Sequence, residues 1–299
     1  QNYEPTLIGC DEHVLLARKV AEKSMVLLKN KGKIIHNDGS DLEVAQQIAQ
    51  SVDAVVLMVG YTYKDEGEYI PQISKGLGDR INLGLRENEI KLINAVSKVN
   101  QKCVVVLVGG SAILMEEWRT RVPAILMAWY SGMEGGNALA DILFGVINPS
   151  GKLPLTIPTD PAHLPFFDIY VDEIEYGYYH GYTLMEKENI EPAFPFGFGL
   201  SYTEYSYNNI RAESTEEKII VSVDISNIGA IAGEEIVQLY VGFENSSVDR
   251  PIKLLRGFKK VALNPNETKT VSIEVMKKDF AWYNPDSRVW EVEKIEYTI

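Results

Sequence analysis

Two kinds of hydrophobic pattern divide the chain. Before about residue 145, short runs of consecutive apolar residues alternate with segments in which apolar residues recur every three or four positions. The runs predict buried parallel strands, and the longer spacing predicts amphipathic helices. Strands are predicted at 54–59, 103–108 and 124–128, and helices at 11–30, from residue 42, at 86–99, near Met115 and at 134–144. Because strands joined through helices form right-handed crossovers, we predict an α/β fold, a three-layer αβα sandwich with a mostly parallel sheet.

The pattern changes after residue 149. Proline, glycine and aromatic residues dominate the stretch to residue 204, which predicts an ordered connector, since a disordered segment would carry fewer aromatics. Beyond residue 205, alternation with a period of two predicts strands at 218–226, 235–241, 254–263, 268–275 and 289–299. We therefore predict two domains, an αβα sandwich with its connector at 1–204 and a small antiparallel β-sandwich at 205–299.

Composition narrows the classes of function. The 299 residues, 45% of them hydrophobic, are enough for a packed core in each domain. A net charge of -13 argues against nucleic acid as a partner, because a polyanion would be repelled. No run approaches the roughly 18 apolar residues of a membrane span, so no membrane partner is expected. Cys10 and Cys103 are expected to be free, buried thiols, and with no signal peptide visible the cytoplasm is favoured over secretion.

The loop after the first of the predicted strands concentrates the candidate chemistry. That strand stops at Gly60, and the loop beyond it carries Asp65, Glu66 and Glu68 among three tyrosines. Repulsion between like charges and partial desolvation would raise the pKa of one carboxyl and keep it protonated near neutral pH. The loop is therefore predicted to carry a general acid.

Other motifs give weaker signals. Three of the four histidines, at 13, 36 and 163, lack the spacing of metal ligands, so no metal is expected. No complete G-x-G-x-x-G follows the strand at 103–108, so no cofactor is expected. His180 lies between tyrosines, where it either packs within the connector or lines a cleft. Trp129 and Tyr130 could stack on a sugar, although a core role at the end of a strand is the default interpretation.

Six blocks, taken in order, resemble a known family. They are 19–32, the acidic loop with 78–80, 128–136, 148–154, 194–203 and 255–259. Together they resemble glycoside hydrolase family 3, in its β-glucosidase-like branch, over nearly the whole chain. The resemblance implies an αβα sandwich followed by a fibronectin-III-like (Ig-like) sandwich, normally preceded by a (β/α)8, or TIM, barrel. In that family the barrel supplies an aspartate nucleophile and binds most of the sugar, while the αβα sandwich supplies the acid/base glutamate.

The resemblance leaves two candidates for that glutamate. Matching a Glu-Gly pair followed by an aromatic residue selects Glu66, whereas counting back from the Gly-Asp-Arg at 78–80 selects Glu68, which we prefer. Asp79, Arg80 and His180 are predicted to contact the substrate. A retaining glycosidase needs two carboxyl groups about 5–5.5 Å apart that flank the glycosidic bond. Since the glutamate of the family approaches the sugar from one side only, the nucleophile has to come from elsewhere.

The 299 residues do not include a barrel pattern. We therefore predict the acid/base part of a retaining β-glucosidase-type hydrolase, acting on a β-linked glucoside, a related oligosaccharide or an aryl glycoside. Its predicted partner is a TIM-barrel domain or subunit, and the apolar face that would meet the barrel predicts a homo- or hetero-oligomer. The alternative is a non-catalytic carbohydrate-binding or protein-interaction module derived from such an enzyme.

Overall fold

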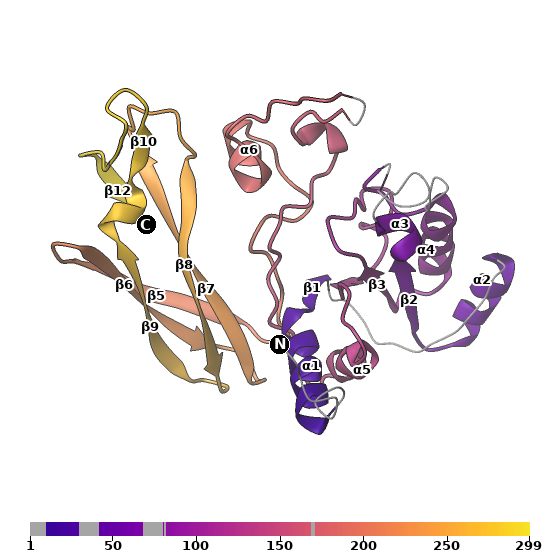
Figure 1. Ribbon diagram of the computed structural model, residues 1–299. Helices are drawn as coiled ribbons and strands as arrows, with labels where there is room; N and C mark the ends of the chain where they lie inside the picture. The colour runs from indigo at the N-terminus through magenta and orange to yellow at the C-terminus, as the bar shows by residue number, and fades with distance from the viewer. Residues whose placement is uncertain (1–9, 30–41, 68–79, 81, 169–170) are drawn as a thin grey trace. The chain divides into compact units, whose positions relative to one another are not determined.

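A computed structural model describes residues 10–29, 42–67, 80, 82–168 and 171–299 (Figure 1). The chain divides into two compact units. Unit 1 comprises Gln1–His163 and Pro192–Leu200, and unit 2 comprises Leu164–Glu191 and Ser201–Ile299. The chain therefore passes from one unit to the other three times. The domain boundary between residues 204 and 205 stays a prediction.

Unit 1 is built around one sheet of four strands. These are β1 (Val26–Lys29), β2 (Val55–Gly60), β3 (Cys103–Val108) and β4 (Ala124–Met127), in the order β1-β4-β3-β2. β2, β3 and β4 run parallel, and β1 pairs with β4 in the antiparallel sense. The mostly parallel sheet predicted from the apolar runs is confirmed.

Helices flank this sheet. They are α1 (Asp11–Ser24), α2 (Leu42–Ser51), the short α3 (Tyr63–Glu66), α4 (Glu87–Val99) and α5 (Gly135–Leu143), with a 3-10 turn at Pro161–His163. α2 packs beside α4, and α1 packs beside α5. Ile93 and Val96 of α4 share a core cluster with Leu57 of β2 and Leu107 of β3. Since successive residues of β3 are buried although they point to opposite faces, both faces of the central strand are covered.

Two predictions in unit 1 were wrong. The helix predicted at 11–30 ends at Ser24, because Met25 adopts an extended conformation and Val26–Lys29 pairs with β4. Apolar residues at helical spacing thus run on into a short strand that only its partner in the sheet defines. The short helix predicted near Met115 is a series of turns.

Unit 2 is an antiparallel β-sandwich, as predicted. One sheet has the order β5-β6-β9 and the other β12-β7-β8, while β10 and β11 form a hairpin. Val221, Leu239 and Val275 belong to a core cluster between the sheets. The strands are β5 (Tyr205–Ser214), β6 (Lys218–Asn227), β7 (Gly233–Glu244), β8 (Lys253–Leu263), β9 (Thr268–Met276), β10 (Trp282–Asn284), β11 (Val289–Glu291) and β12 (Glu296–Thr298); α6 (Gly181–Lys187) and a 3-10 turn at Lys277–Phe280 complete the unit.

Some of these strands differ from the predicted ones. β5 was not predicted, because eight of its ten residues are exposed and the strand lacks an apolar face. The single strand predicted at 289–299 is two strands, of which β11 pairs with β10 and β12 pairs with β7. The residues between them turn because Glu293 accepts hydrogen bonds from Ser246 and Ser247.

The two cysteines are free thiols. Cys103 is fully buried in β3, as predicted. Cys10 is partly exposed ahead of α1, a helix with mostly exposed residues, so the prediction of a buried thiol there was wrong. Within the described ranges, no helix combines the length and the apolar character that crossing a membrane requires.

Candidate active site

The acidic loop starts at a close approach between the ends of β2 and β3. Gly60 at the end of β2 has a φ of 136°, and a Cβ there would collide with the backbone carbonyl of Val108. Glycine is therefore required at this position. The Tyr61 N–H donates to the Val108 carbonyl at 2.8 Å, and the chain then turns into α3. This geometry places the carboxylates of α3 at the carboxyl edge of the parallel sheet, where active sites of such sheets form.

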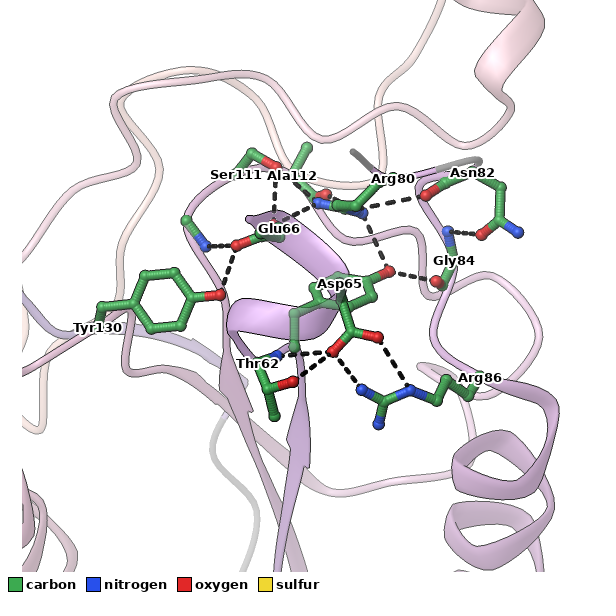
Figure 2. Close-up of polar contacts among 12 residues, drawn as sticks. Thr62, Asp65, Glu66, Arg80, Asn82, Gly84, Arg86, Ser111, Ala112 and Tyr130 are labelled. Carbon is green, nitrogen blue, oxygen red and sulfur yellow. Dashed lines mark hydrogen bonds and ion pairs between the residues drawn. The ribbon is translucent and has the colours of Figure 1, made fainter. Parts of the chain in front are cut away.

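Asp65 holds the start of this turn. Its Oδ2 accepts hydrogen bonds from the Thr62 N–H at 2.8 Å and from the Thr62 hydroxyl at 2.9 Å. The carboxylate also forms an ion pair with Arg86, the residue before α4 (Figure 2). Asp65 therefore ties α3 to α4 and is engaged in local structure.

Glu66 lies at the centre of the polar cluster (Figure 2). Its Oε2 accepts hydrogen bonds from the Gly110 N–H at 2.8 Å and from the Tyr130 hydroxyl at 2.6 Å. Its Oε1 accepts from Arg80 Nη1 at 3.0 Å and, more weakly, from the Ser111 hydroxyl at 3.4 Å. The side chain is 13% exposed. All four donors therefore converge on one nearly buried carboxylate.

Arg80 holds the other end of the acidic loop. Its Nη1 also donates to the Ser111 hydroxyl at 2.6 Å, and its Nη2 donates to the Ala112 carbonyl at 2.9 Å. Nη2 donates as well to the Tyr61 hydroxyl at 3.0 Å, and Nε donates to the Asn82 carbonyl at 3.3 Å. The guanidinium carbon lies 4.0 Å from the centre of the Tyr61 ring. With a side chain only 9% exposed, Arg80 is fixed in place.

These contacts keep Asp65 and Glu66, the two described carboxylates of the acidic loop, ionised. Burial alone would raise the pKa of Glu66, but hydrogen bonds from Tyr130 and Gly110, together with Arg80, outweigh burial and lower the pKa. Burial would likewise raise the pKa of Asp65, and the bonds from Thr62 and the Arg86 cation lower it. Neither Asp65 nor Glu66 is therefore the one protonated carboxyl that the sequence predicts, because each faces donors and a cation, and that protonated carboxyl stays a prediction.

Tyr130 complements Glu66. Burial and the neighbouring Glu66 carboxylate raise the pKa of Tyr130 to about 12. Its hydroxyl therefore stays protonated and remains a hydrogen-bond donor at neutral pH. The default interpretation of Tyr130 as a core residue is wrong, since 53% of it is exposed and its hydroxyl binds Glu66.

The structure brings together Glu66 and Arg80 from the set of predicted site residues. Glu68 and Asp79 lie outside the described residues. His180 belongs to unit 2, where its backbone N–H donates to the Thr183 hydroxyl at 3.3 Å at the start of α6. Its contact with a substrate stays a prediction.

Sequence analysis did not connect three of the groups that hold Glu66 with that glutamate. Gly110 and Ser111 follow β3, and Tyr130 follows β4, so each stands just beyond the carboxyl end of a parallel strand. The rule that such ends meet at one edge of the sheet could have predicted their convergence with the loop after β2. Among the described residues, no three His, Cys, Asp or Glu side chains are grouped so that they could hold a metal.

The position of the ion pair in the sequence defines what the cluster can do. Glu66 and Arg80 stand on either side of the segment that contains Glu68 and Asp79. Their ion pair therefore joins the two described residues that flank this segment. The cluster is suited to positioning a loop, and its own carboxylates are poorly suited to donating a proton.

Comparison with known families identifies the family to which the chain belongs. Residues 35–202 match the glycosyl hydrolase family 3 C-terminal domain, and residues 235–299 match the fibronectin type III-like domain. The chain belongs to glycosyl hydrolase family 3. The family resemblance of the six blocks and the predicted order of the two sandwiches are thereby confirmed.

Several relatives of this family 3 chain are β-glucosidases. It is 42% identical to thermostable beta-glucosidase B of Acetivibrio thermocellus over 294 residues, which cover 94% of this chain and 38% of that protein. Identity to the beta-glucosidase of Kluyveromyces marxianus is 38% over 271 residues, covering 88% of this chain and 31% of that protein. The family 3 chain thus spans well under two thirds of the curated relatives that it matches.

Solved structures support the same assignment. The Kluyveromyces marxianus beta-glucosidase in complex with glucose matches with a TM-score of 0.74 and 35% identity, over 87% of this chain and 32% of that one. A family 3 beta-glucosidase of Bifidobacterium adolescentis matches with a TM-score of 0.84 and 26% identity, over 96% of this chain and 51% of that one. Both structures extend well beyond the part that this family 3 chain matches.

Proposed function

We propose that the chain is the acid/base part of a retaining β-glucosidase-type hydrolase, with Glu68 as the general acid/base and Glu66 as a positioning residue. The observation that carries this proposal is the 3.0 Å ion pair between Glu66 and Arg80. A general acid must hold a proton before the reaction, and the lowered pKa of Glu66 is unsuited to that role. Of the two glutamates that the family resemblance selects, Glu68 is then the acid.

The proposed reaction has two steps. The Glu68 carboxylic acid donates its proton to the departing glycosidic oxygen while a carboxylate of the barrel attacks the anomeric carbon and forms a glycosyl ester. The Glu68 carboxylate then takes a proton from water, whose oxygen attacks the anomeric carbon and releases the sugar and the barrel carboxylate. The substrate class is a β-linked glucoside, by analogy with the relatives named β-glucosidases.

Glu66 contributes through position. Because it closes the loop with Arg80 and binds Gly110 and Tyr130, it fixes where the loop leaves the sheet. Because Glu68 is two residues further along the chain, anchoring Glu66 should limit the positions that Glu68 can take. A small displacement of a catalytic group lowers the rate strongly, so loss of Glu66 should reduce activity on every substrate.

The test needs a barrel. This chain replaces the matching 38% of the Acetivibrio thermocellus enzyme. The fusion is assayed unmodified and as three variants, Glu68→Gln, Glu66→Gln and Glu87→Gln. Glu87 is the matched control, because its side chain is 83% exposed on α4 and contacts Lys91 on the same helix. Substrates are cellobiose, whose leaving group needs a proton, and dinitrophenyl β-glucoside, whose leaving group does not.

Glu68→Gln should lower kcat/KM for cellobiose by about a hundredfold or more and affect the dinitrophenyl substrate far less. With dinitrophenyl β-glucoside, azide should restore turnover of Glu68→Gln and yield glucosyl azide, because azide can attack the glycosyl ester without a general base. Glu66→Gln should lower kcat/KM for both substrates by similar factors without rescue, and Glu87→Gln should change neither. Azide rescue in Glu66→Gln would reverse the assignment, and full activity of both variants would remove the proposed function.

A further inference from the structure

An arginine in unit 2 projects from an irregularity in the sheet. In the pairing of β7 with β8, Leu239 lies opposite Gly257 and the next residue, Tyr240, lies opposite Leu255. Arg256 therefore has no residue opposite it and occupies a β-bulge. Bulges redirect a side chain and are common near functional sites.

The neighbouring glycine accommodates this bulge. A Cβ at Gly257 would lie 2.5 Å from Cγ2 of Ile273, so a larger residue would force β8 away from β9. The sequence thus provides space for β8 to bend at this point.

Arg256 has no partner in the described part of the chain. It is half-buried, its Nε is fully buried without a hydrogen bond, and no ion pair joins it to a described residue. Burial lowers the pKa of Arg256, and the nearby Arg250 lowers it further, while Asp279 acts in the opposite direction without forming an ion pair. An arginine nevertheless stays protonated. Burying a cation without a partner is unfavourable, which makes an external acceptor the natural complement.

Residues of α6 and the segment before it frame this arginine. The Leu255 N–H donates to the Tyr182 hydroxyl at 3.1 Å, and Lys253 forms a 2.8 Å ion pair with Glu186. These contacts fix α6 against β8. Tyr178, which interacts electrostatically with Arg256, is 63% exposed. Arginine and tyrosine are both enriched among the residues that contribute most to binding at protein interfaces.

We infer that Arg256 is a docking residue that receives a carboxylate from the barrel part of the enzyme, with Tyr178 packing beside the contact. A carboxylate matches the guanidinium in charge and can bind it through two parallel hydrogen bonds. The relatives carry well over half of their length outside the part that this chain matches, and that part can supply the acid. The inference rests on the proposed function only in taking the barrel as the partner.

The experiment compares the stability of two proteins. Arg256→Met, which keeps the length of the side chain and removes its charge, is made in this chain alone and in the fusion with the Acetivibrio thermocellus barrel. In the fusion the midpoint of thermal unfolding should fall by about 5 °C or more, and by less at high salt. In the chain alone the midpoint should stay the same or rise, because a buried unpaired charge is removed.

Arg211→Met is the control. Arg211 is an exposed arginine of β5 whose partner, Asp224, is in the same unit at 3.4 Å, so its replacement should have the same small effect in both proteins. A fall in midpoint for Arg256→Met in the chain alone would reveal an internal partner and overturn the inference. An unchanged midpoint in the fusion would overturn it as well. Neither result depends on glucosidase activity, so the outcome is separate from the test of Glu68.

Discussion

Replacing Glu66 by glutamine tests the anchor of the loop through stability alone. The substitution keeps the size of the side chain, removes its charge and turns one acceptor oxygen into an NH2 donor. Arg80 then loses the carboxylate 3.0 Å away. Whichever way the amide is oriented, its NH2 faces either Arg80 or the donors of Gly110 and Tyr130.

The size of the effect follows from the burial of the pair. Removing one partner of a fully buried ion pair costs about 3–5 kcal/mol. The side chains of Arg80 and Glu66 retain 9% and 13% exposure, so water offsets part of that loss. We expect Glu66→Gln to lower the free energy of unfolding of unit 1 by about 2–4 kcal/mol. At a urea dependence of roughly 2 kcal/mol per molar, the midpoint should fall by about 1–2 M.

Urea unfolding followed by the helical circular dichroism signal is the assay. Four of the longer helices, α1, α2, α4 and α5, belong to unit 1, so this signal reports mainly on the unit that contains Glu66. Glu87→Gln, on the exposed surface of α4, is the matched control and should leave the midpoint nearly unchanged. Equal midpoints for the two variants at neutral pH would refute the anchoring role.

The difference between Glu66→Gln and the unmodified chain should also depend on pH. The native pKa of Glu66 is below its ordinary value of 4.5, so the stabilisation by its carboxylate is complete above that value. As the pH falls through the native pKa, the carboxylate takes up a proton and its stabilisation disappears. The unmodified chain should therefore approach the variant in acid. A difference that persists undiminished in strong acid would contradict the ionised state of Glu66.

Three further predictions concern single residues. Tyr130→Phe should destabilise unit 1 by about 1 kcal/mol and raise the pKa of Glu66, as measured by urea unfolding and by carbonyl NMR titration. Burial would raise the pKa of Glu293, but hydrogen bonds from Ser246, Ser247 and Arg250 outweigh it and lower the pKa to about 2. Glu293→Gln should therefore lower the free energy of unfolding of unit 2 by about 2–3 kcal/mol above the ordinary pKa of 4.5, and the difference should shrink as the pH falls toward 2. A difference that stays constant would refute this. Gly60→Ala should cost more than about 3 kcal/mol in unfolding experiments, because its backbone conformation and the clash with β3 exclude a side chain. Gly136→Ala in α5, where a Cβ meets nothing within 4 Å, is its control and should be neutral or stabilising.

Local pattern was sufficient to predict the framework of the fold. The run at 103–108 is β3 to the residue, because a central parallel strand is apolar on both faces and needs no partner to identify it. β1 was hidden because its four residues continue the spacing of the helix before them. β5 was hidden because it has no apolar face. Both elements are defined by pairing with distant strands, which periodicity does not record.

The electrostatics of the site also depend on distant residues that local sequence patterns do not record. The sequence places Asp65, Glu66 and Glu68 close together and predicts a raised pKa for one of them, since only near neighbours can be read from it. In the folded chain Gly110 and Tyr130 approach Glu66 from 44 and 64 residues away, and their hydrogen bonds lower its pKa. The location of the loop was predictable from the glycine that ends β2. The protonation states of Asp65 and Glu66 could be assigned only from the tertiary structure.

The three passages of the chain between its units limit how evolution can rearrange it. Residues 164–191 belong with the β-sandwich, although 192–200, which follow them, belong with the αβα unit. A gene cut at residue 200 would separate Tyr182 and Glu186 from the strand that they contact. Domain shuffling by a single crossover would therefore transfer an incomplete sandwich. A transfer that keeps the sandwich complete has to include residues 164–191 together with 201–299.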